Sequence, residues 1–133
     1  ISNVVEKPVF PRMTEVVLER TFDIESAKNL VIENNLSVNL SDSQYAFHIN
    51  SKGIDKAYGF KHVMDMLSIT KDDVIAIGDS ETDIPLFKTA TTSIALGNSS
   101  DFVKSQASFS VSSKSGDGLI EALDKLAHKL SEE

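Results

Sequence analysis

The stretch VIAIGDSETDIPLF, Val74 to Phe87, decides the fold class of this chain. It opens with five apolar or small residues, continues into Gly-Asp-Ser at 78–80, and places a second aspartate at Asp83. Short apolar segments of this kind are typical of buried strands in parallel sheets. Ligands of open parallel sheets gather outside the carboxyl ends of the strands. We therefore predict a strand over 74–78 and a functional site directly after it.

Helices and short apolar strands alternate on either side of this stretch. The apolar pattern predicts, in chain order, a helix over 57–67, a short helix over 83–90, a strand over 92–96, a helix over 100–107, a strand over 108–112 and a helix over 116–130. Such alternation is the pattern of a parallel sheet covered on both faces. Residues 52–133 are thus predicted to be an α/β unit.

The first part of the chain has a different pattern. Apolar and polar residues alternate over 15–20 and 45–50, as in strands with one solvated face, and a shorter strand is expected over 37–43. Asp23 is a good helix N-cap, and apolar residues at helical spacing follow it. We predict a small β-α-β-β unit over 1–51, as part of an α+β domain that precedes the α/β unit.

Composition excludes several classes of protein. With 20 acidic and 13 basic residues the net charge is −7, so a nucleic-acid surface, which requires clustered Lys and Arg, is not expected. The absence of cysteine excludes disulfides, thiolate nucleophiles and cysteine-based zinc sites. No apolar run approaches the roughly 20 residues of a membrane span. We expect a cytoplasmic protein without a nucleic-acid or membrane partner.

Two aspartates and one lysine are candidates for chemistry. Asp79 follows the predicted strand and Asp83 begins the next short helix, so both carboxylates can face a hard cation such as Mg²⁺. Turn formation by Asp79 and helix capping by Asp83 would explain the same spacing. Lys56 lies near a helix N-terminus, where its charge opposes the helix dipole and favours a phosphate or carboxylate partner. Spacing alone supports Lys52 or Lys61 equally, or a solvated lysine.

The arginines and histidines carry weaker signals. Arg12 and Arg20 are the only arginines, and either is a candidate to bind a substrate carboxylate, with a plain surface charge as the alternative. The three histidines lack the spacing of metal ligands. They are expected on a polar strand face and on two exposed helix positions: His48, His62 and His128.

Motifs in a fixed order run through residues 52–123. Lys56, near a helix start, is followed by a glycine and two aspartates at fixed spacing, namely Gly78, Asp79 and Asp83. This order resembles the C-terminal half of phosphatases of the haloacid dehalogenase (HAD) superfamily. The lysine matches their third motif, and the glycine and aspartates match their fourth, G-D-x-x-N-D. The likeness is to the Cof-like branch, which also holds sucrose-phosphate phosphatases.

Further segments extend the resemblance, and one position departs from it. ALGNSS at 95–100 matches a small-residue turn of the family, and SGDGL at 115–119 matches the turn before its last helix. Thr82 stands where the branch commonly has asparagine, in a position that orients rather than ligates. Within the branch, the closest likeness is to the archaeal phosphoglycolate phosphatases.

The resemblance implies a mechanism. In this family an aspartate at the end of the first core strand attacks phosphorus and forms an aspartyl-phosphate, and a second aspartate acts as general acid and base. A Mg²⁺ ion bridges the nucleophile and a phosphoryl oxygen. The resemblance assigns Asp79 and Asp83 to the metal, and Lys56 to charge neutralisation on the phosphoryl group. It assigns substrate contacts to Ser80 and Asn98 as well as to the lysine.

The first motif of the family, D-x-D-x-T/S, is absent from this sequence, and so is the second-motif Ser/Thr strand. Its nearest imitation, LSDSQ at 40–44, lacks the second aspartate. The resemblance therefore implies that residues 1–51 are the later part of a cap domain and that 52–133 are the C-terminal part of the core. The nucleophile would lie outside this chain. The core sheet would then have an open edge for the missing N-terminal half of the core or for a second copy.

The function predicted from these residues is Mg²⁺-dependent hydrolysis of a phosphomonoester. The expected substrate is a small phosphorylated acid, with phosphoglycolate first. A sugar-phosphate phosphatase of the same superfamily is the alternative, because cap residues set specificity and part of the cap is missing. A third hypothesis is a non-catalytic fragment or subunit that binds metal and a partner chain. Alone, this chain is expected to be inactive.

Overall fold

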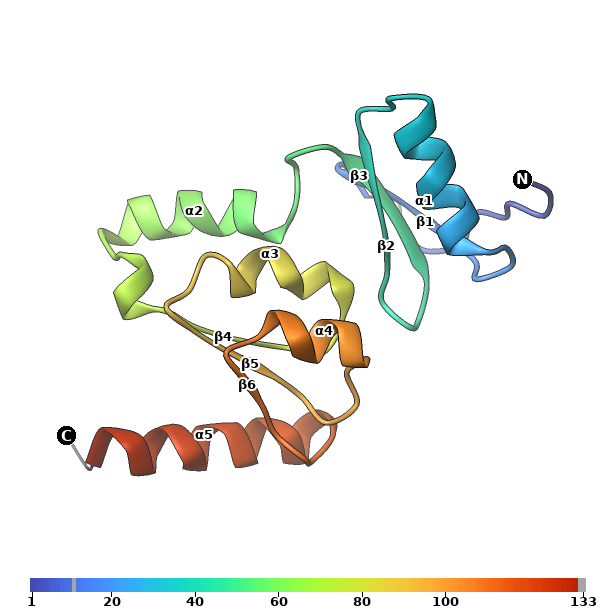
Figure 1. Ribbon diagram of the computed structural model, residues 1–133. Helices are drawn as coiled ribbons and strands as arrows, with labels where there is room; N and C mark the ends of the chain where they lie inside the picture. The colour runs from blue at the N-terminus through green and yellow to red at the C-terminus, as the bar shows by residue number, and fades with distance from the viewer. Residues whose placement is uncertain (11, 132–133) are drawn as a thin grey trace.

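Two three-stranded sheets organise the chain, one antiparallel and one parallel (Figure 1). The structure, a computed structural model, describes residues 1–10 and 12–131. The antiparallel unit comprises β1 (Glu15–Leu18), α1 (Ile24–Glu33), β2 (Val38–Asp42) and β3 (Phe47–Ser51). The parallel unit comprises α2 (Lys56–Leu67), β4 (Ile75–Gly78), α3 (Ile84–Phe87), β5 (Thr92–Ala95), α4 (Asp101–Gln106), β6 (Phe109–Ser110) and α5 (Ser115–Ser131). The predicted α/β fold class, with a small antiparallel unit first, is confirmed.

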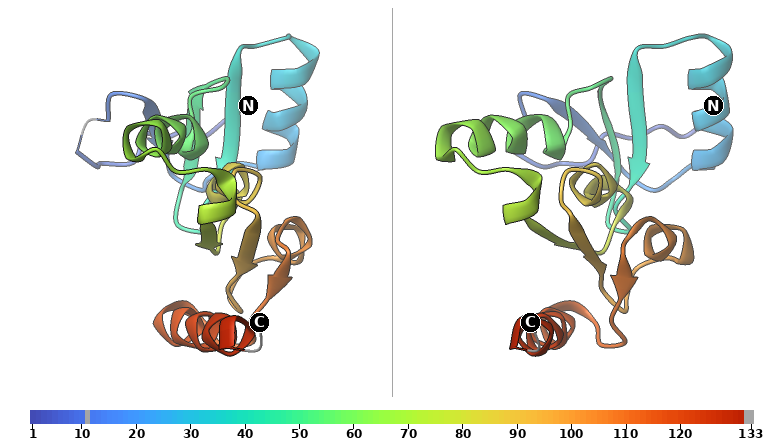
Figure 2. Two further views of the ribbon diagram at one scale, coloured as in Figure 1. Left: turned by 90° about the vertical axis from the view of Figure 1, so that its left-hand side faces the viewer. Right: turned by 60° about the vertical axis from the view of Figure 1, so that its left-hand side comes forward.

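The antiparallel sheet has the strand order β1-β3-β2. Its helix, α1, begins where the Asp23 side chain accepts a hydrogen bond from Ser26 N at 2.9 Å, so the predicted N-cap is confirmed. α1 lies on the face of the sheet that is turned away from α2 (Figures 1 and 2). The other face of the sheet is therefore the one available to the parallel unit.

The face turned toward the parallel unit is mostly polar, although Val17 lies opposite His48 on the same face. Phe22, just before α1, packs against Phe47 with ring centroids 4.9 Å apart. The next residue, His48, points to the opposite face, because successive side chains of a strand alternate. The register places His48 beside Ser41 on that face. Amides and hydroxyls thus face the parallel unit, so the cavity between the two units has one polar wall.

The parallel sheet has the order β4-β5-β6 and is covered on both faces. α5 lies on one face, and α3 and α4 lie on the other (Figures 1 and 2). Ile94 in the centre of β5 is fully buried with Ala122 and Leu126 of α5. Phe87 of α3 and Val103 of α4 are buried on the opposite face. Packing from both sides holds the carboxyl ends of β4 and β5 in place.

α2 connects the two units. It follows a tight turn at Gly53, whose φ of +84° is accessible to glycine without steric cost. Its N-cap, Asp55, accepts a hydrogen bond from Tyr58 N at 2.9 Å. α2 packs on α3, which brings its first residue, Lys56, to the loop after β4.

The apolar side chains of two predicted helices, 57–67 and 116–130, are buried only in part. On α5, Leu119, Ile120 and Leu123 remain exposed. On α2 and β4, exposed apolar side chains are those of Val63, Met66, Leu67 and Ile75. The apolar surface around β4 is therefore larger than this chain itself covers. In the part of the chain that the structure describes, no helix combines the length and apolar character that a membrane span requires.

Candidate functional site

The candidate site lies where β4 and β5 end, in the loops 78–83 and 96–100. Gly78 is the last residue of β4, and Asp83 packs directly over it. A Cβ atom at position 78 would lie 2.5 Å from the Asp83 Cβ, so glycine is required while Asp83 keeps its place. A short 3₁₀ turn, Glu81–Asp83, then leads into α3. The motif glycine thus allows the second aspartate to fold back over the strand end.

Asp83 is a buried carboxylate that organises this loop. Its Oδ2 accepts hydrogen bonds from Asp79 N at 3.0 Å, and from Ser80 N and Ser80 Oγ at 3.1 Å. Its Oδ1 forms an ion pair with Lys56 Nζ at 2.5 Å. Burial raises the pKa of Asp83, but Lys56 and the loop amides outweigh burial and hold that pKa below its ordinary value. The carboxylate is therefore charged at neutral pH, and both oxygens are engaged.

Lys56 reaches the site from the start of α2. As the first residue after the N-cap, its positive charge opposes the helix dipole. Asp83 supplies the compensating carboxylate that this placement predicted. The Lys56 side chain is still 52% exposed, and it lines the main cavity. Since an ammonium carries three donors, Lys56 can contact an anion in the cavity while it stays paired with Asp83.

Asp79 is held by the loop after β5. Its Oδ2 accepts a hydrogen bond from Asn98 Nδ2 at 2.7 Å, and Asn98 Oδ1 accepts one from Ser115 N at 2.9 Å. Among the described residues, no donor contacts Asp79 Oδ1. Asp79 also lines the main cavity. One carboxylate oxygen is therefore left for a cation or a water molecule.

The carboxylates fit a Mg²⁺ ion that has few protein ligands. No group of three or more Asp, Glu or His side chains in residues 1–10 and 12–131 is arranged to hold a metal. In phosphate sites, however, Mg²⁺ commonly takes one or two carboxylates, substrate oxygens and several waters. Asp79 suits this role through Oδ1. Asp83 would contribute mainly its charge in the observed arrangement, because Lys56 and the loop amides occupy its oxygens.

Ser80 and Asn98 are both held by protein partners. Ser80 is buried, and its hydroxyl lies 2.7 Å from Thr82 Oγ1 and 3.1 Å from Asp83 Oδ2. Thr82, the departure from the family motif, thus supports Ser80 through its hydroxyl. Asn98 borders a smaller neighbouring pocket rather than the main cavity. The observed contacts stabilise the two loops, and substrate binding by Ser80 or Asn98 stays a prediction.

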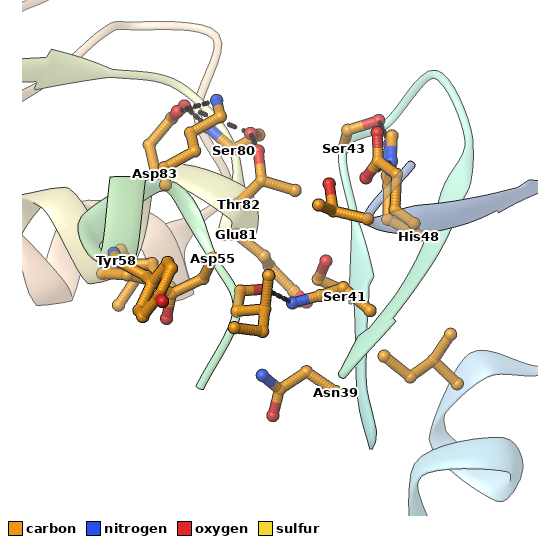
Figure 3. A pocket seen from close by; sticks show the side chains of 18 of the residues that line it. Asn39, Ser41, Ser43, His48, Asp55, Tyr58, Ser80, Glu81, Thr82 and Asp83 are labelled. Atoms are coloured by element: carbon orange, nitrogen blue, oxygen red, sulfur yellow. Dashed lines mark hydrogen bonds and ion pairs between the residues drawn. The ribbon is translucent and has the colours of Figure 1, made fainter. Parts of the chain in front are cut away.

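The main cavity, of about 950 Å³, lies between these loops and the polar face of the antiparallel sheet. Figure 3 shows its two walls facing each other. We name the first the loop wall, formed by Lys56, Asp79, Ser80, Thr82 and Asp83. The second is the strand wall, formed by Asn39, Ser41, Ser43, His48 and Asn50. A ligand in the cavity would thus contact charged groups on one side and amides, hydroxyls and an imidazole on the other.

His48 is fixed from both sides on the strand wall. Its Nδ1 lies 3.0 Å from Glu15 Oε2, and its Nε2 lies 2.8 Å from Ser43 Oγ. Arg12 also contacts Glu15. The predicted position on a polar strand face is confirmed, and the side chain is buried in a network rather than solvated.

The two arginines differ in their relation to the cavity. Arg12 lines the main cavity and pairs with Glu15. Arg20 borders the smaller pocket, of about 370 Å³, and pairs with Asp42 Oδ2 at 2.8 Å. Of the two arginines predicted to bind a substrate carboxylate, Arg12 is the one that lines the main cavity.

Sequence reasoning did not single out Glu81. Its Oε2 accepts hydrogen bonds from Lys28 Nζ and from Asp42 N, each at 3.1 Å. Lys28 also pairs with Glu25 at 3.0 Å. Burial lowers the pKa of Lys28, but Glu25 and Glu81 together raise it above its ordinary value. No local pattern marks Glu81, because its two partners lie 53 and 39 positions away in the sequence.

Comparison with known proteins places the chain in a family. Residues 13–123 match the sequence model of the haloacid dehalogenase-like hydrolases. The chain is 65% identical over 132 residues to a phosphoglycolate phosphatase of Nitrosopumilus maritimus, and 36% identical over 117 residues to one of Methanosarcina acetivorans. Among solved structures, the sucrose-phosphatase from Synechocystis superposes with a TM-score of 0.74 over 94% of this chain, at 14% identity. That likeness concerns the fold alone.

The matches cover much of this chain but only part of the proteins that it resembles. The two phosphoglycolate phosphatases align over 99% and 88% of this chain, and over 57% and 52% of their own lengths. The sucrose-phosphatase aligns over 57% of its own length. The chain therefore spans little more than half of these relatives.

Proposed function

The chain belongs to the haloacid dehalogenase-like hydrolases, and from this membership we propose that it forms the metal- and phosphate-binding part of a Mg²⁺-dependent phosphomonoester hydrolase. The observation that carries the proposal is the network of ion pairs and hydrogen bonds in the loop wall. Asp83 ties Lys56 to the loop amides, while Asp79 keeps one oxygen open to the cavity. Fixed charges of both signs at the end of a parallel strand suit a phosphate anion and its cation.

In the proposed reaction, an aspartate from a segment outside this chain attacks phosphorus and forms an aspartyl-phosphate while the P–O bond to the leaving alcohol breaks. A second aspartate, also outside this chain, protonates the leaving oxygen, and water then hydrolyses the aspartyl-phosphate to release inorganic phosphate. Lys56 binds the phosphoryl oxygens and offsets their growing charge. Asp83 keeps that ammonium in place and fixes the amides of Asp79 and Ser80. When bound, Mg²⁺ would be held by Asp79, with Asp83 contributing charge nearby, and would supply electrostatic stabilisation of the phosphoryl group.

We further propose a small phosphorylated acid, phosphoglycolate first, as the substrate. The support is the naming of the two archaeal relatives as phosphoglycolate phosphatases. Arg12 is our candidate for the substrate carboxylate because it lines the cavity. Glu15, its partner, also contacts His48, so Glu15 would keep one partner if Arg12 turned to a substrate.

A sugar-phosphate phosphatase is the second candidate, and the strand wall favours it. Asn39, Ser41 and Asn50 offer neutral amides and hydroxyls to the cavity, which suit the hydroxyl groups of a sugar. The rates at which phosphoglycolate and a panel of sugar phosphates are hydrolysed distinguish the two candidates.

The proposal includes a division of the chain at residue 51. Residues 1–51 would belong to a cap domain and residues 52–133 to the core. The antiparallel sheet ends at Ser51, and α2 begins at Lys56, which supports a boundary between them.

The test compares this chain with a version extended upstream by the segment that the relatives contain. We expect Mg²⁺-dependent phosphatase activity from the extended protein and none from the 133-residue chain alone. We also expect the short chain to self-associate, because β4 ends the described sheet with apolar side chains exposed beside it. Light scattering and a phosphatase assay decide both points. An active, monomeric short chain would overturn the proposed division of labour, and an inactive extended protein would favour a metal-binding subunit.

A further inference from the structure

Glu81 lies between Asp79 and Asp83 in the loop after β4, but its side chain contacts the antiparallel unit. Its Oε2 accepts hydrogen bonds from Lys28 Nζ and Asp42 N, each at 3.1 Å. The Glu81 side chain is 22% exposed, so this contact is largely out of solvent. One carboxylate therefore joins α1, the end of β2 and the loop after β4.

The contact with Asp42 N follows from the register of the antiparallel sheet. β2 is an edge strand, with β3 on one side only. Ser43 N donates to Ala46 O across the pair, so the N–H of the preceding residue, Asp42, points away from β3. An outward N–H that is shielded from water needs an acceptor, and Glu81 supplies it.

A second bridge connects the same unit to the other loop of the site. Gln44, in the turn between β2 and β3, donates from Nε2 to the carbonyl of Asn98 at 3.3 Å. The side chain of Asn98 in turn holds Asp79. The antiparallel unit thus contacts both loops of the site. Glu81 lies two residues after Asp79, and Asn98 is hydrogen-bonded to Asp79.

We propose that Glu81 is a positioning residue that docks the antiparallel unit onto the loop wall and so sets the width of the substrate cavity. The docking contact uses charge as well as a hydrogen bond. Glu81 stands next to Ser80, and an unpaired negative charge there would oppose a phosphate anion. Lys28 neutralises that charge while the unit is docked. Docking therefore narrows the cavity and makes its electrostatics suitable for phosphate in one step.

The kinetic consequence rests on the proposed function. A ligand that binds only the docked arrangement has an apparent affinity reduced by the fraction of molecules that are docked. Weakening the Glu81 contact should therefore raise KM more than it lowers kcat, since saturating substrate restores docking. A residue that merely supports folding would not produce this split.

The kinetic test uses the upstream-extended protein with four variants. Glu81→Ala removes both contacts, Glu81→Gln keeps an acceptor for Asp42 N, and Lys28→Met removes the cation. Glu25→Gln is the matched control, because Glu25 is the other carboxylate partner of Lys28 and stays within α1. We expect KM to rise about tenfold in Glu81→Ala and about threefold in Glu81→Gln and Lys28→Met, with kcat within about twofold. Glu25→Gln should stay within about twofold of the parent protein in both constants. Combining Glu81→Gln with Lys28→Met should cost no more than Lys28→Met alone.

Hydrogen exchange at the Asp42 amide tests the docking without any need for activity. In folded protein, checked by circular dichroism, this amide should exchange about tenfold faster in Glu81→Ala and at the parent rate in Glu25→Gln. An unchanged rate in Glu81→Ala overturns the docking role, and so does an effect of Glu25→Gln as large as that of Glu81→Gln. Faster exchange with an unchanged KM overturns the kinetic role alone. An extended protein without phosphatase activity refutes the proposed function, while the exchange rate still decides the docking.

Discussion

The two walls of the cavity are built from different kinds of contact. On the loop wall, charged side chains are tied to each other and to backbone amides, with Lys56 paired to Asp83 and Asp79 held by Asn98. On the strand wall, amides and hydroxyls surround one imidazole, and His48 is held between Glu15 and Ser43. The contrast supports the proposal that the loop wall binds phosphate and metal, while the strand wall selects the rest of the substrate.

The two walls also differ in the structure that holds their side chains in place. The loop wall stands on β4 and β5, which are packed from both faces by α3, α4 and α5. The strand wall belongs to a small sheet whose described polar links to the loops include those of Glu81 and Gln44. A wall on a rigid support suits chemistry, which needs fixed charges, and a wall on a separate unit can adapt to the substrate.

The largest effect is expected from Asp79→Asn in the upstream-extended protein. The substitution removes the charge of the only loop-wall carboxylate that has an oxygen free for a cation among the described residues. We expect kcat/KM to fall about 10²–10³-fold and the Mg²⁺ concentration for half-maximal activity to rise. The melting temperature should change little, because Asn98 is the main partner of the Asp79 side chain.

Asp83→Asn is the matched comparison for this prediction. It should lower both activity and stability, since Asp83 pairs with Lys56 and accepts the loop amides. Full activity of Asp79→Asn at low Mg²⁺ would remove Asp79 from the metal and break the division between the walls.

Gly78→Ala should produce the next largest effect, on stability. The new Cβ would lie 2.5 Å from the Cβ and 2.7 Å from the Cγ of Asp83, so Asp83 must move. We expect a loss of about 1–3 kcal/mol in the free energy of unfolding, measured by urea denaturation. Gly59→Ala is the control, because no atom outside the adjacent residues and the helix backbone lies within 4 Å of a Cβ there, and alanine favours the α2 helix by about 0.5–1 kcal/mol. Equal effects at the two glycines would contradict the close approach of Asp83.

A smaller and different effect is expected from His48→Gln on the strand wall. Glutamine can place an amide atom near the position of the imidazole Nε2, beside Ser43, but has no polar atom at the position of Nδ1, so the contact with Glu15 is lost. KM should rise by up to about tenfold and relative activity among substrates should change, while kcat stays within about twofold. His62→Gln, on the exposed side of α2, should leave both constants unchanged. A drop in kcat without a change in KM would move His48 to the chemical step.

The residues of the loop wall could be predicted from the sequence far better than those of the strand wall, because most of the loop-wall residues lie close together along the chain. Gly78, Asp79 and Asp83 lie within six positions, so a motif and a strand end suffice to bring them together. Lys56 lies at a helix start and pairs with a carboxylate, as its charge against the helix dipole favours. Spacing alone supports Lys52 or Lys61 equally, and the family resemblance selects Lys56. The contacts that such reasoning can find are those that local geometry imposes.

The contacts that it missed depend on how the two units meet. Glu81 gains its partners only after α1 and β2 dock on the loop, and nothing near Glu81 in the sequence specifies that arrangement. The apolar face of α5 shows the same limit. Helical spacing predicts that Leu126 shares an apolar stripe with Leu119 and Leu123, yet the sheet buries Leu126 and leaves the other two exposed. Periodicity indicates which residues favour burial but not whether a partner within the chain covers them.

The smallest effect is expected from Glu121→Gln, behind the loop wall. Glu121 accepts hydrogen bonds from Ser113 N at 2.8 Å and from Ser112 Oγ at 3.1 Å, and pairs with Lys125 at 2.9 Å. Lys125 first, and then the Ser113 amide, hold the pKa of Glu121 far below its ordinary value of 4.5. A carboxylate whose pKa is lowered by folding stabilises the protein above its unfolded pKa, and this stabilisation is lost as pH falls toward the folded pKa.

The stability difference between the parent protein and Glu121→Gln should therefore be constant from pH 6 to 8 and should shrink below about pH 4.5. Urea midpoints at a series of pH values measure it, with Glu25→Gln, an exposed helical glutamate, as the control. Because Glu121 lies at the surface, its effect should be the smallest of those predicted here, and kcat/KM should not change. A pH-independent difference would mean that glutamine disturbs the loop by its shape. A loss of kcat/KM comparable to that of Asp79→Asn would mean that the turn at 112–115 positions Asn98 and Asp79 more directly than the packed sheet does.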